Sequence, residues 1–171
     1  LNTLGQNLLG YGPTSINIGA GTANDNEATI DQDGVKNIAV ISQGYAGNYD
    51  GVRRGVAEGN TGSIEQVGDR NAALPGQGLR GGEAYNNDFS ILQDGSRNYA
   101  LTDQGSNTGY AENNVADIEQ FGSRNSATIV QGSPQALGPP YSFNYVSTNS
   151  LGEVFQDGTG NEATVTQRNG N

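Results

Sequence analysis

Short runs of alternating residues recur along the chain, and each begins with Asn, or in one case with Ser, and ends with Gln. The stretch NEATIDQDGVKNIAVISQ, residues 26–43, contains such a run twice, with openings at Asn26 and Asn37. In the first run of each copy the third residue is usually small and the fifth is usually β-branched. A period of two places these constant residues on one face of a β-strand. The pattern therefore predicts strands whose inner faces carry an amide at each end.

The pair of runs occurs five times, at residues 26–43, 60–77, 87–104, 114–131 and 150–167. Four residues join the two runs, and the second of them is always glycine: Gly34, Gly68, Gly95, Gly122 and Gly158. A glycine at a fixed place in a turn indicates a backbone with positive φ. The linkers between pairs vary in length and are rich in Gly, Asn, Tyr and Pro, as in repeat proteins that carry insertions on one face. Residues 1–25 fit the frame poorly and are expected to form a Gly-rich leader before a repeat domain at 26–171.

Each pair is interpreted as a strand, an arch and a second strand that faces the first through inner side chains. Each strand then pairs with its counterpart in the next repeat, about 4.8 Å away. The predicted fold is all-β, a two-sheet β-solenoid of five strand–arch–strand repeats with in-register cross-β stacking. Pro75 lies inside a strand, so the second repeat is expected to be weakened and to contribute least to nucleation.

The amides at the strand ends are the candidate functional residues. An unpaired buried amide costs on the order of several kcal/mol, whereas stacked amides can each donate to the copy below and accept from the copy above. Turn formation accounts for Asn after Gly, but it does not account for Gln at one place in all ten runs. The predicted ladder residues, which fix the register and serve assembly, are Asn26, Gln32, Asn37, Gln43, Asn60, Gln66, Asn71, Gln77, Asn87, Gln93, Asn98, Gln104, Asn114, Gln120, Asn125, Gln131, Ser150, Gln156, Asn161 and Gln167.

Composition excludes several classes of function. The 171 residues carry a formal net charge of −10, which disfavours nucleic acid and anionic lipid as partners. With no Cys and no His, catalysis would rest on carboxylates, and these lie at outward repeat positions without a singular pair. The chain is therefore not expected to be an enzyme. No calcium-loop period and no long apolar segment occur, so neither a cofactor or metal nor membrane insertion is predicted.

The outward faces of the two predicted sheets differ in chemistry. The first runs expose mainly acidic residues, such as Glu27 and Asp31, and the second runs expose apolar ones, such as Ile38 and Val130. The apolar face is a candidate for fibre bundling or adhesion, or else an ordinary scatter of exposed residues. The Lys or Arg that ends four of the arches is either a solvated turn charge or part of a basic stripe. The linker tyrosines are expected to pack loops onto the solenoid or to serve adhesion.

The frame Gln, x-Gly-x-x, Asn-x-Ala-x-x-x-Gln over residues 26–167 resembles the curlin repeat of the curli major subunit. The resemblance implies a secreted bacterial subunit that polymerises outside the cell into amyloid fibres of the biofilm matrix. It further implies three partners: copies of the chain itself, a nucleator subunit and an outer-membrane secretion channel. Only the arch DGTG at 157–160 keeps the family's second glycine, only Ser150 keeps its opening Ser, and the linkers are longer. These departures indicate a distant relative.

Two functions remain open on these grounds. Open strand edges at both ends of a solenoid would let identical copies stack head to tail into an extracellular fibre at the bacterial surface. A non-polymerising β-solenoid adhesin or spike segment would share the ladder core but carry capped ends. Growth of cross-β fibres by the purified protein distinguishes the first from the second.

Overall fold

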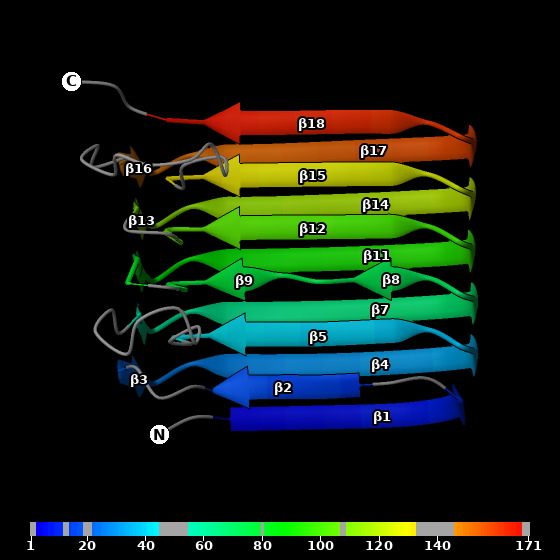
Figure 1. Ribbon diagram of the computed structural model, residues 1–171, viewed down its shortest axis with the longest axis horizontal. Helices are drawn as coiled ribbons and strands as arrows, with labels where there is room; N and C mark the ends of the chain where they lie inside the picture. The colour runs from blue at the N-terminus through cyan, green and yellow to red at the C-terminus, as the bar shows by residue number, and fades with distance from the viewer. Residues whose placement is uncertain are drawn as a thin grey trace.

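The computed structural model describes residues 3–11, 14–18, 22–44, 55–79, 81–106, 109–132 and 146–168. All regular secondary structure within these residues is β-strand. Figure 1 shows the strands stacked one upon another from β1 near the N-terminus to β18 near the C-terminus. Neighbouring strands in the stack are parallel and join like positions of successive repeats, as in the pairing of Ile30 with Ile64. The predicted all-β solenoid with in-register stacking is confirmed.

The longest strands form a six-stranded sheet in the order β1-β4-β7-β11-β14-β17. Each of these strands has nine residues; from β4 onward it continues from the first run of a repeat through most of the arch. The bounds are β1 (Thr3–Tyr11), β4 (Glu27–Val35), β7 (Thr61–Asp69), β11 (Asp88–Ser96), β14 (Val115–Ser123) and β17 (Leu151–Thr159).

The second runs form a seven-stranded sheet in the order β18-β15-β12-β8-β5-β2, with β9 pairing β12 and β5. The bounds are β2 (Thr14–Ile18), β5 (Ile38–Gln43), β8 (Ala72–Ala73), β9 (Gly76–Gln77), β12 (Tyr99–Gln104), β15 (Ser126–Gln131) and β18 (Glu162–Gln167). Pro75 lies between β8 and β9 and has no N–H to donate, so the strand of the second repeat is interrupted there. Its effect on nucleation stays a prediction.

A third, narrow sheet was not predicted. Its three-residue strands are β3 (Thr22–Asn24), β6 (Val56–Glu58), β10 (Glu83–Tyr85), β13 (Tyr110–Glu112) and β16 (Val146–Thr148), in the order β16-β13-β10-β6-β3. The residue after each strand has positive φ, between 50° and 65°, and is Asp, Gly or Asn. These residue types tolerate the left-handed conformation, which turns the chain into the first run of the repeat. Each coil therefore has three sides rather than two.

Residues 1–25, expected to form a leader, contain strands of the solenoid. β1 pairs with β4 from Thr3 and Glu27 to Tyr11 and Val35, and β2 pairs with β5. Figure 1 shows these two strands below β4 and β5, continuing the same stack. The repeat frame missed them because Leu8 is paired with Gln32 and Ile18 with Gln43, so neither carries the diagnostic amide.

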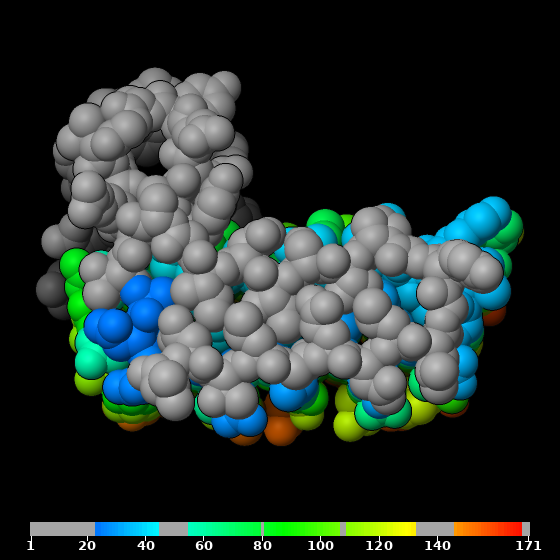
Figure 2. Space-filling view, turned by 90° about the horizontal axis from the view of Figure 1, so that it is seen from below, coloured from blue at the N-terminus to red at the C-terminus, as the bar shows by residue number. Residues whose placement is uncertain are grey.

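The core is a thin apolar layer between the two larger sheets. Its largest aliphatic side chains are fully buried and stack along the axis: Ile30, Ile41, Ile64, Ile91, Ile118 and Ile129. Phe89 occupies a position that Ala or Gly fills in the other repeats, and a Cβ on Gly62 would overlap its ring. Glycine at position 62 therefore makes room for the one aromatic ring in the described core. Seen from below, the coloured atoms extend farther in the horizontal direction, in which the strands of Figure 1 run, than in the vertical direction (Figure 2).

Candidate assembly interface

The glutamines that end the first run of each repeat form one hydrogen-bonded column. Nε2 of each residue donates to Oε1 of the glutamine in the following repeat, at 2.5–2.8 Å, along Gln32, Gln66, Gln93, Gln120 and Gln156. From the second repeat onward Nε2 also donates to a backbone carbonyl of the second sheet, at 3.0–3.2 Å. These side chains are no more than 6% exposed. The column thus joins rung to rung and sheet to sheet.

The glutamines that end the second strands form a parallel column. Nε2 donates to Oε1 of the next glutamine at 2.7–2.9 Å, along Gln43, Gln77, Gln104, Gln131 and Gln167. The same nitrogen donates to a first-sheet carbonyl, as in the 3.0 Å bond from Gln104 to Asp88. In both columns donation runs toward the following repeat. Every glutamine column consequently has a donor end at the last repeat and an acceptor end at the first.

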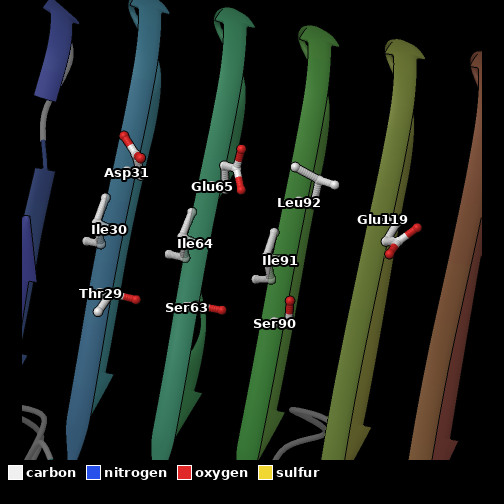
Figure 3. A pocket seen from close by; sticks show the side chains of 10 residues that line it. All are labelled: Thr29, Ile30, Asp31, Ser63, Ile64, Glu65, Ser90, Ile91, Leu92 and Glu119. Carbon is white, nitrogen blue, oxygen red and sulfur yellow. The ribbon is translucent and has the colours of Figure 1, made fainter. Parts of the chain in front are cut away.

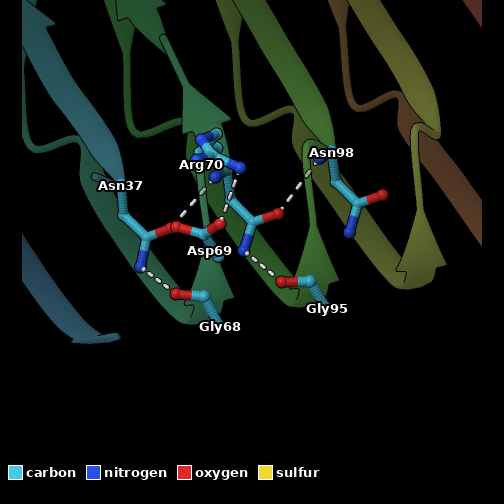
Figure 4. A network of polar contacts seen from close by, with 7 residues as sticks. Asn37, Gly68, Asp69, Arg70, Gly95 and Asn98 are labelled. Atoms are coloured by element: carbon cyan, nitrogen blue, oxygen red, sulfur yellow. Dashed lines mark hydrogen bonds and ion pairs between the residues drawn. The ribbon is translucent and has the colours of Figure 1, made fainter. Parts of the chain in front are cut away.

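Asparagines that open the second strands bind backbone rather than each other's side chains. Oδ1 accepts the backbone N–H of the next asparagine at 2.9–3.1 Å, along Asn37, Asn71, Asn98, Asn125 and Asn161. Nδ2 donates to the carbonyl of the arch glycine in the following repeat, at 3.1–3.2 Å. Figure 4 shows the bond from Asn37 to Gly68 and, in the next repeat, the bond that the Gly95 carbonyl accepts from Asn71. The expected ladder between side chains is replaced here because asparagine is shorter and stands beside the turned backbone of the arch.

The residues that open the first strands connect the first sheet to the third. Oδ1 accepts the backbone N–H of the next opening residue at 2.9–3.0 Å, and Nδ2 donates to a third-sheet carbonyl of the following repeat at 2.9 Å. Direct bonds between side chains, at 3.1 Å, also join Asn60 to Asn26 and Asn87 to Asn60. Ser150 ends this column and donates its backbone N–H to Asn114. The acceptor carbonyls belong to the third sheet, so this contact was beyond the sequence prediction.

The arch glycines have φ between 97° and 132°, in the region expected for them. A Cβ on Gly34, Gly68, Gly95 or Gly122 would overlap the carbonyl oxygen of the arch glycine in the following repeat. Gly158 is different, because a Cβ at this position would meet only Nδ2 of Asn161 among the described atoms, at 3.8 Å. The arch residues Lys36, Arg70, Arg97 and Arg124 have φ of 58–61°, and Arg70 forms an ion pair with Asp69 at 3.0 Å. The close backbone stack therefore requires glycine at the second arch position wherever another described rung follows.

The last rung is incomplete on one side. β17 and β18 end their sheets within the described residues, and Asn161 is exposed although its counterparts in earlier repeats are buried. Ala163 and Val165 are only half-buried, although their equivalents in β15 are fully covered. Gln167 donates to the carbonyl of Leu151 at 2.6 Å, and no described rung follows it. The C-terminal edge therefore presents inner side chains and backbone groups that one more rung would cover.

The first edge of the glutamine columns also has an unsatisfied group. Oε1 of Gln43 is buried and has no hydrogen-bond partner among the described residues. In every later repeat this oxygen accepts from the preceding glutamine, at 2.7–2.9 Å. The missing partner is thus an N–H donor on the side of the preceding rung.

The outer faces differ from the sequence prediction in part. Figure 3 shows Thr29, Ser63 and Ser90 in one row of a shallow depression on the first sheet, with Asp31 among the residues of a second row. The acidic residues of this face are exposed or half-buried, as expected. The most exposed large apolar side chain of the described residues, however, is Phe155 of β17, at 67%. The predicted exposure of apolar residues on the second sheet is confirmed for Ile38, whereas Val130 is buried and the first sheet exposes Phe155.

Two tyrosines attributed to linkers lie in the third sheet. Tyr85 and Tyr110 occupy neighbouring strands, with ring centroids 5.6 Å apart, and Tyr110 donates to Glu112 at 2.9 Å. Burial, followed by this hydrogen bond, raises the pKa of Tyr110 to about 12. Packing on the solenoid is therefore observed for these two rings. Tyr45, Tyr49, Tyr141 and Tyr145 lie outside the described residues.

The described part of the chain contains no group of three or more His, Cys, Asp or Glu residues placed to hold a metal ion. It also contains no helix of the length and apolarity that crossing a membrane requires.

These features define a class of protein, the parallel β-solenoid whose rungs are joined by columns of side-chain amides. The family model of the curlin associated repeat matches residues 23–49, which include β4, the first arch and β5. This match supports a curlin-family relationship for the chain. Comparisons with curated proteins and with solved structures gave no match.

Proposed function

We propose that the protein is the structural subunit of an extracellular, curli-like functional amyloid fibre that assembles head to tail. The single observation that supports this most strongly is the complementarity of the two ends of the glutamine column. The column ends in the amide of Gln167 at one edge and in the unpartnered acceptor of Gln43 at the other. A second copy stacked on the last rung would place its own Gln43 where a following repeat would stand.

Stacking of this kind is heterologous, because one end of a copy contacts the opposite end of the next. Such contacts do not close and produce a filament. A strand edge with unpaired backbone groups is the template that promotes this pairing. Half-buried Val165 and the other inner residues of the last rung would gain burial on stacking, worth about 25 cal/mol per Å² of apolar surface removed from water.

The finer parts of the proposal follow from the curlin relationship. Fibres of this family belong to the cell surface, which accords with a role in biofilm matrix and adhesion and with a structural rather than an enzymatic function. The proposed partners are other copies of the chain, a nucleator subunit and an outer-membrane secretion channel. Within this proposal the amide columns and arch glycines have a second use, since they would set the register between subunits as they do between repeats.

A non-polymerising β-solenoid adhesin or spike segment is the second candidate. The observation that favours it is the pairing of β1 and β2 with the first repeat, which covers the edge opposite to β17 and β18. A covered edge is how solenoids limit their own stacking. The two candidates differ in whether purified protein grows into fibres.

The test is incubation of purified protein, followed by light scattering, electron microscopy and fibre diffraction. The proposal predicts fibres with a meridional spacing of about 4.8 Å. Persistent monomer under conditions that keep the chain folded would overturn it and favour the adhesin.

A matched pair of variants tests the stacking geometry. Gly158→Ala would place a Cβ toward the Gly34 carbonyl of the next copy, as the earlier arch glycines face the glycine of the next repeat. Gly160→Ala lies in the same arch and also at positive φ, but Arg or Lys occupies this position in the other repeats. We expect Gly158→Ala to slow elongation strongly and Gly160→Ala to elongate like the wild type. Equal elongation by both variants would contradict stacking at this edge.

A further inference from the structure

The N-terminal edge of the repeat stack is already paired by the chain itself. β1 pairs with β4 along nine residues, and β2 pairs with β5 along five, so the backbone groups of the first repeat have partners. If a second copy contributed its last rung to this edge, it would pair with the same two strands. The chain's own β1 and β2 and the last rung of a second copy therefore compete for one surface.

The chain's own rung does not complete the side-chain column that begins at Gln43. Ile18 is the residue paired with Gln43. Isoleucine has no side-chain N–H to donate. Oε1 of Gln43 is fully buried and has no described partner, which is costly for a polar atom removed from water. β2 thus supplies backbone pairing and leaves the amide acceptor unsatisfied.

The last rung of a second copy would supply what β2 lacks. Gln167 stands at the same column position as Gln43, and its primary amide has two N–H groups. One donates to the carbonyl of Leu151, while each preceding glutamine in this column additionally donates to the glutamine that follows it. Stacked below Gln43, such a residue would satisfy the buried acceptor and continue the column without a break.

We propose that β1 and β2 form a displaceable cap, which occupies the edge of the first repeat in the monomer and is replaced there by the last rung of another copy. This inference rests on the proposed function, because it concerns the same head-to-tail contact. Opposite Gln43 the cap carries Ile18, so it makes one side-chain hydrogen bond fewer than the last rung of another copy would make. Displacement of the cap then becomes a slow step before a fibre elongates, and the strength of the cap sets the lag.

Ile18→Gln in the full-length chain tests the cap by adding the missing donor. A hydrogen bond to the buried acceptor shifts the competition toward the cap by about five-fold, so the lag before light scattering rises should lengthen by a similar factor. Asn17→Gln is the matched control, because it introduces the same side chain one position away, opposite Ser42. The control should retain the wild-type lag.

A second variant moves the lag in the opposite direction. Asn7→Pro with Ser15→Pro weakens β1 and β2, because proline has no N–H and does not fit inside a paired strand. This variant should shorten the lag several-fold, and amides of residues 3–11 and 14–18 in the wild type should lose their hydrogen-exchange protection when the monomer becomes fibre.

The outcomes of these experiments separate the two proposals. If every variant and the wild type form fibres with the same lag, or if Ile18→Gln shortens the lag, the cap is refuted and the fibre proposal stands. If none of them forms fibres although hydrogen exchange shows folded strands, the fibre proposal fails first. Opposite shifts for Ile18→Gln and the proline variant, with the control unchanged, support the cap.

Discussion

Replacing one central glutamine with leucine would measure how much the columns contribute to stability. Gln104 is the best choice because it is fully buried in the middle repeat and contacts both neighbours in its column. Leucine is of similar size and keeps the apolar packing, so the change removes mainly hydrogen bonds. Two buried side-chain groups lose their partners in the column: Oε1 of Gln131 loses its donor, and Nε2 of Gln77 loses its 2.9 Å acceptor. The backbone carbonyls of Asp88 and Asn114 also lose the bond from Gln104 Nε2.

Each buried group without its partner costs about 1–3 kcal/mol. The cost is at the lower end for Gln77, because its Nε2 keeps two longer bonds to backbone carbonyls, at 3.3 and 3.4 Å. Burying a leucine instead of an amide offsets part of the loss, so Gln104→Leu should lower the free energy of unfolding by about 2–3 kcal/mol. That is a large share of the stability of an ordinary domain, about 5–15 kcal/mol.

The matched control is Gln43→Leu at the end of the same column. This change removes the donor to Gln77 but also removes the unpartnered Oε1 of Gln43, so the two effects nearly cancel. Urea denaturation of freshly isolated monomer, followed by circular dichroism, compares the variants. With a slope of about 2 kcal/mol/M, Gln104→Leu should lower the midpoint by about 1 M and Gln43→Leu by much less. Equal midpoints for the two variants would refute the energetic role assigned to the column.

Three further predictions concern the core and the third sheet. Gly62→Ala and Phe89→Ala should each destabilise the fold, by about 1–3 and about 3–5 kcal/mol respectively. The double variant should be at least about 1 kcal/mol more stable than the sum of the two losses predicts, because the three atoms nearest to a Cβ at position 62 all belong to the Phe89 ring; additive losses in a double-mutant cycle would contradict this packing. Thr102→Val should raise the urea midpoint by an amount worth about 1 kcal/mol or more, since the Thr102 hydroxyl is buried without a partner among the described residues, and an unchanged or lower midpoint would count against it. Glu112→Gln should lower the raised pKa of Tyr110, which an ultraviolet titration of tyrosinate measures. In the wild type, the free energy of unfolding should fall as pH rises from the unfolded pKa near 10 to about 12, because the folded chain retains a proton that the unfolded chain releases. A normal Tyr110 titration in the wild type would refute the contact.

The strand faces and the column positions were predictable because residue type and spacing repeat together. A period of two fixes which side chains share a face, so the buried positions of Asn26, Ile30 and Gln32 follow from alternation alone. A fixed offset between repeats then implies that like residues stack. The glycine at the second arch position was predictable for the same reason, since its place never changes while its neighbours do.

Other features had weaker or no sequence signals. Three-residue strands are too short to show alternation, and the third sheet left only a recurrent Ala three positions before the opening Asn, as at Ala57 and Ala84. β1 and β2 are joined to the first repeat by backbone pairing. The sequence does not indicate this pairing, because Leu8 and Ile18 stand where the repeats have glutamine. The partners of the asparagines depend on side-chain length and on the turned backbone beside them, which spacing cannot specify.

The most direct test is a contact between molecules within a fibre. Solid-state NMR of fibres grown from a mixture of copies labelled with ¹⁵N and copies labelled with ¹³C detects proximity between different copies only. Head-to-tail continuation of the glutamine column predicts a cross-peak between Nε2 of Gln167 in one copy and the side-chain carbonyl carbon of Gln43 in another. Well-ordered fibres that lack this cross-peak, while uniformly labelled samples show the corresponding contact between Gln131 and Gln167, would contradict the account.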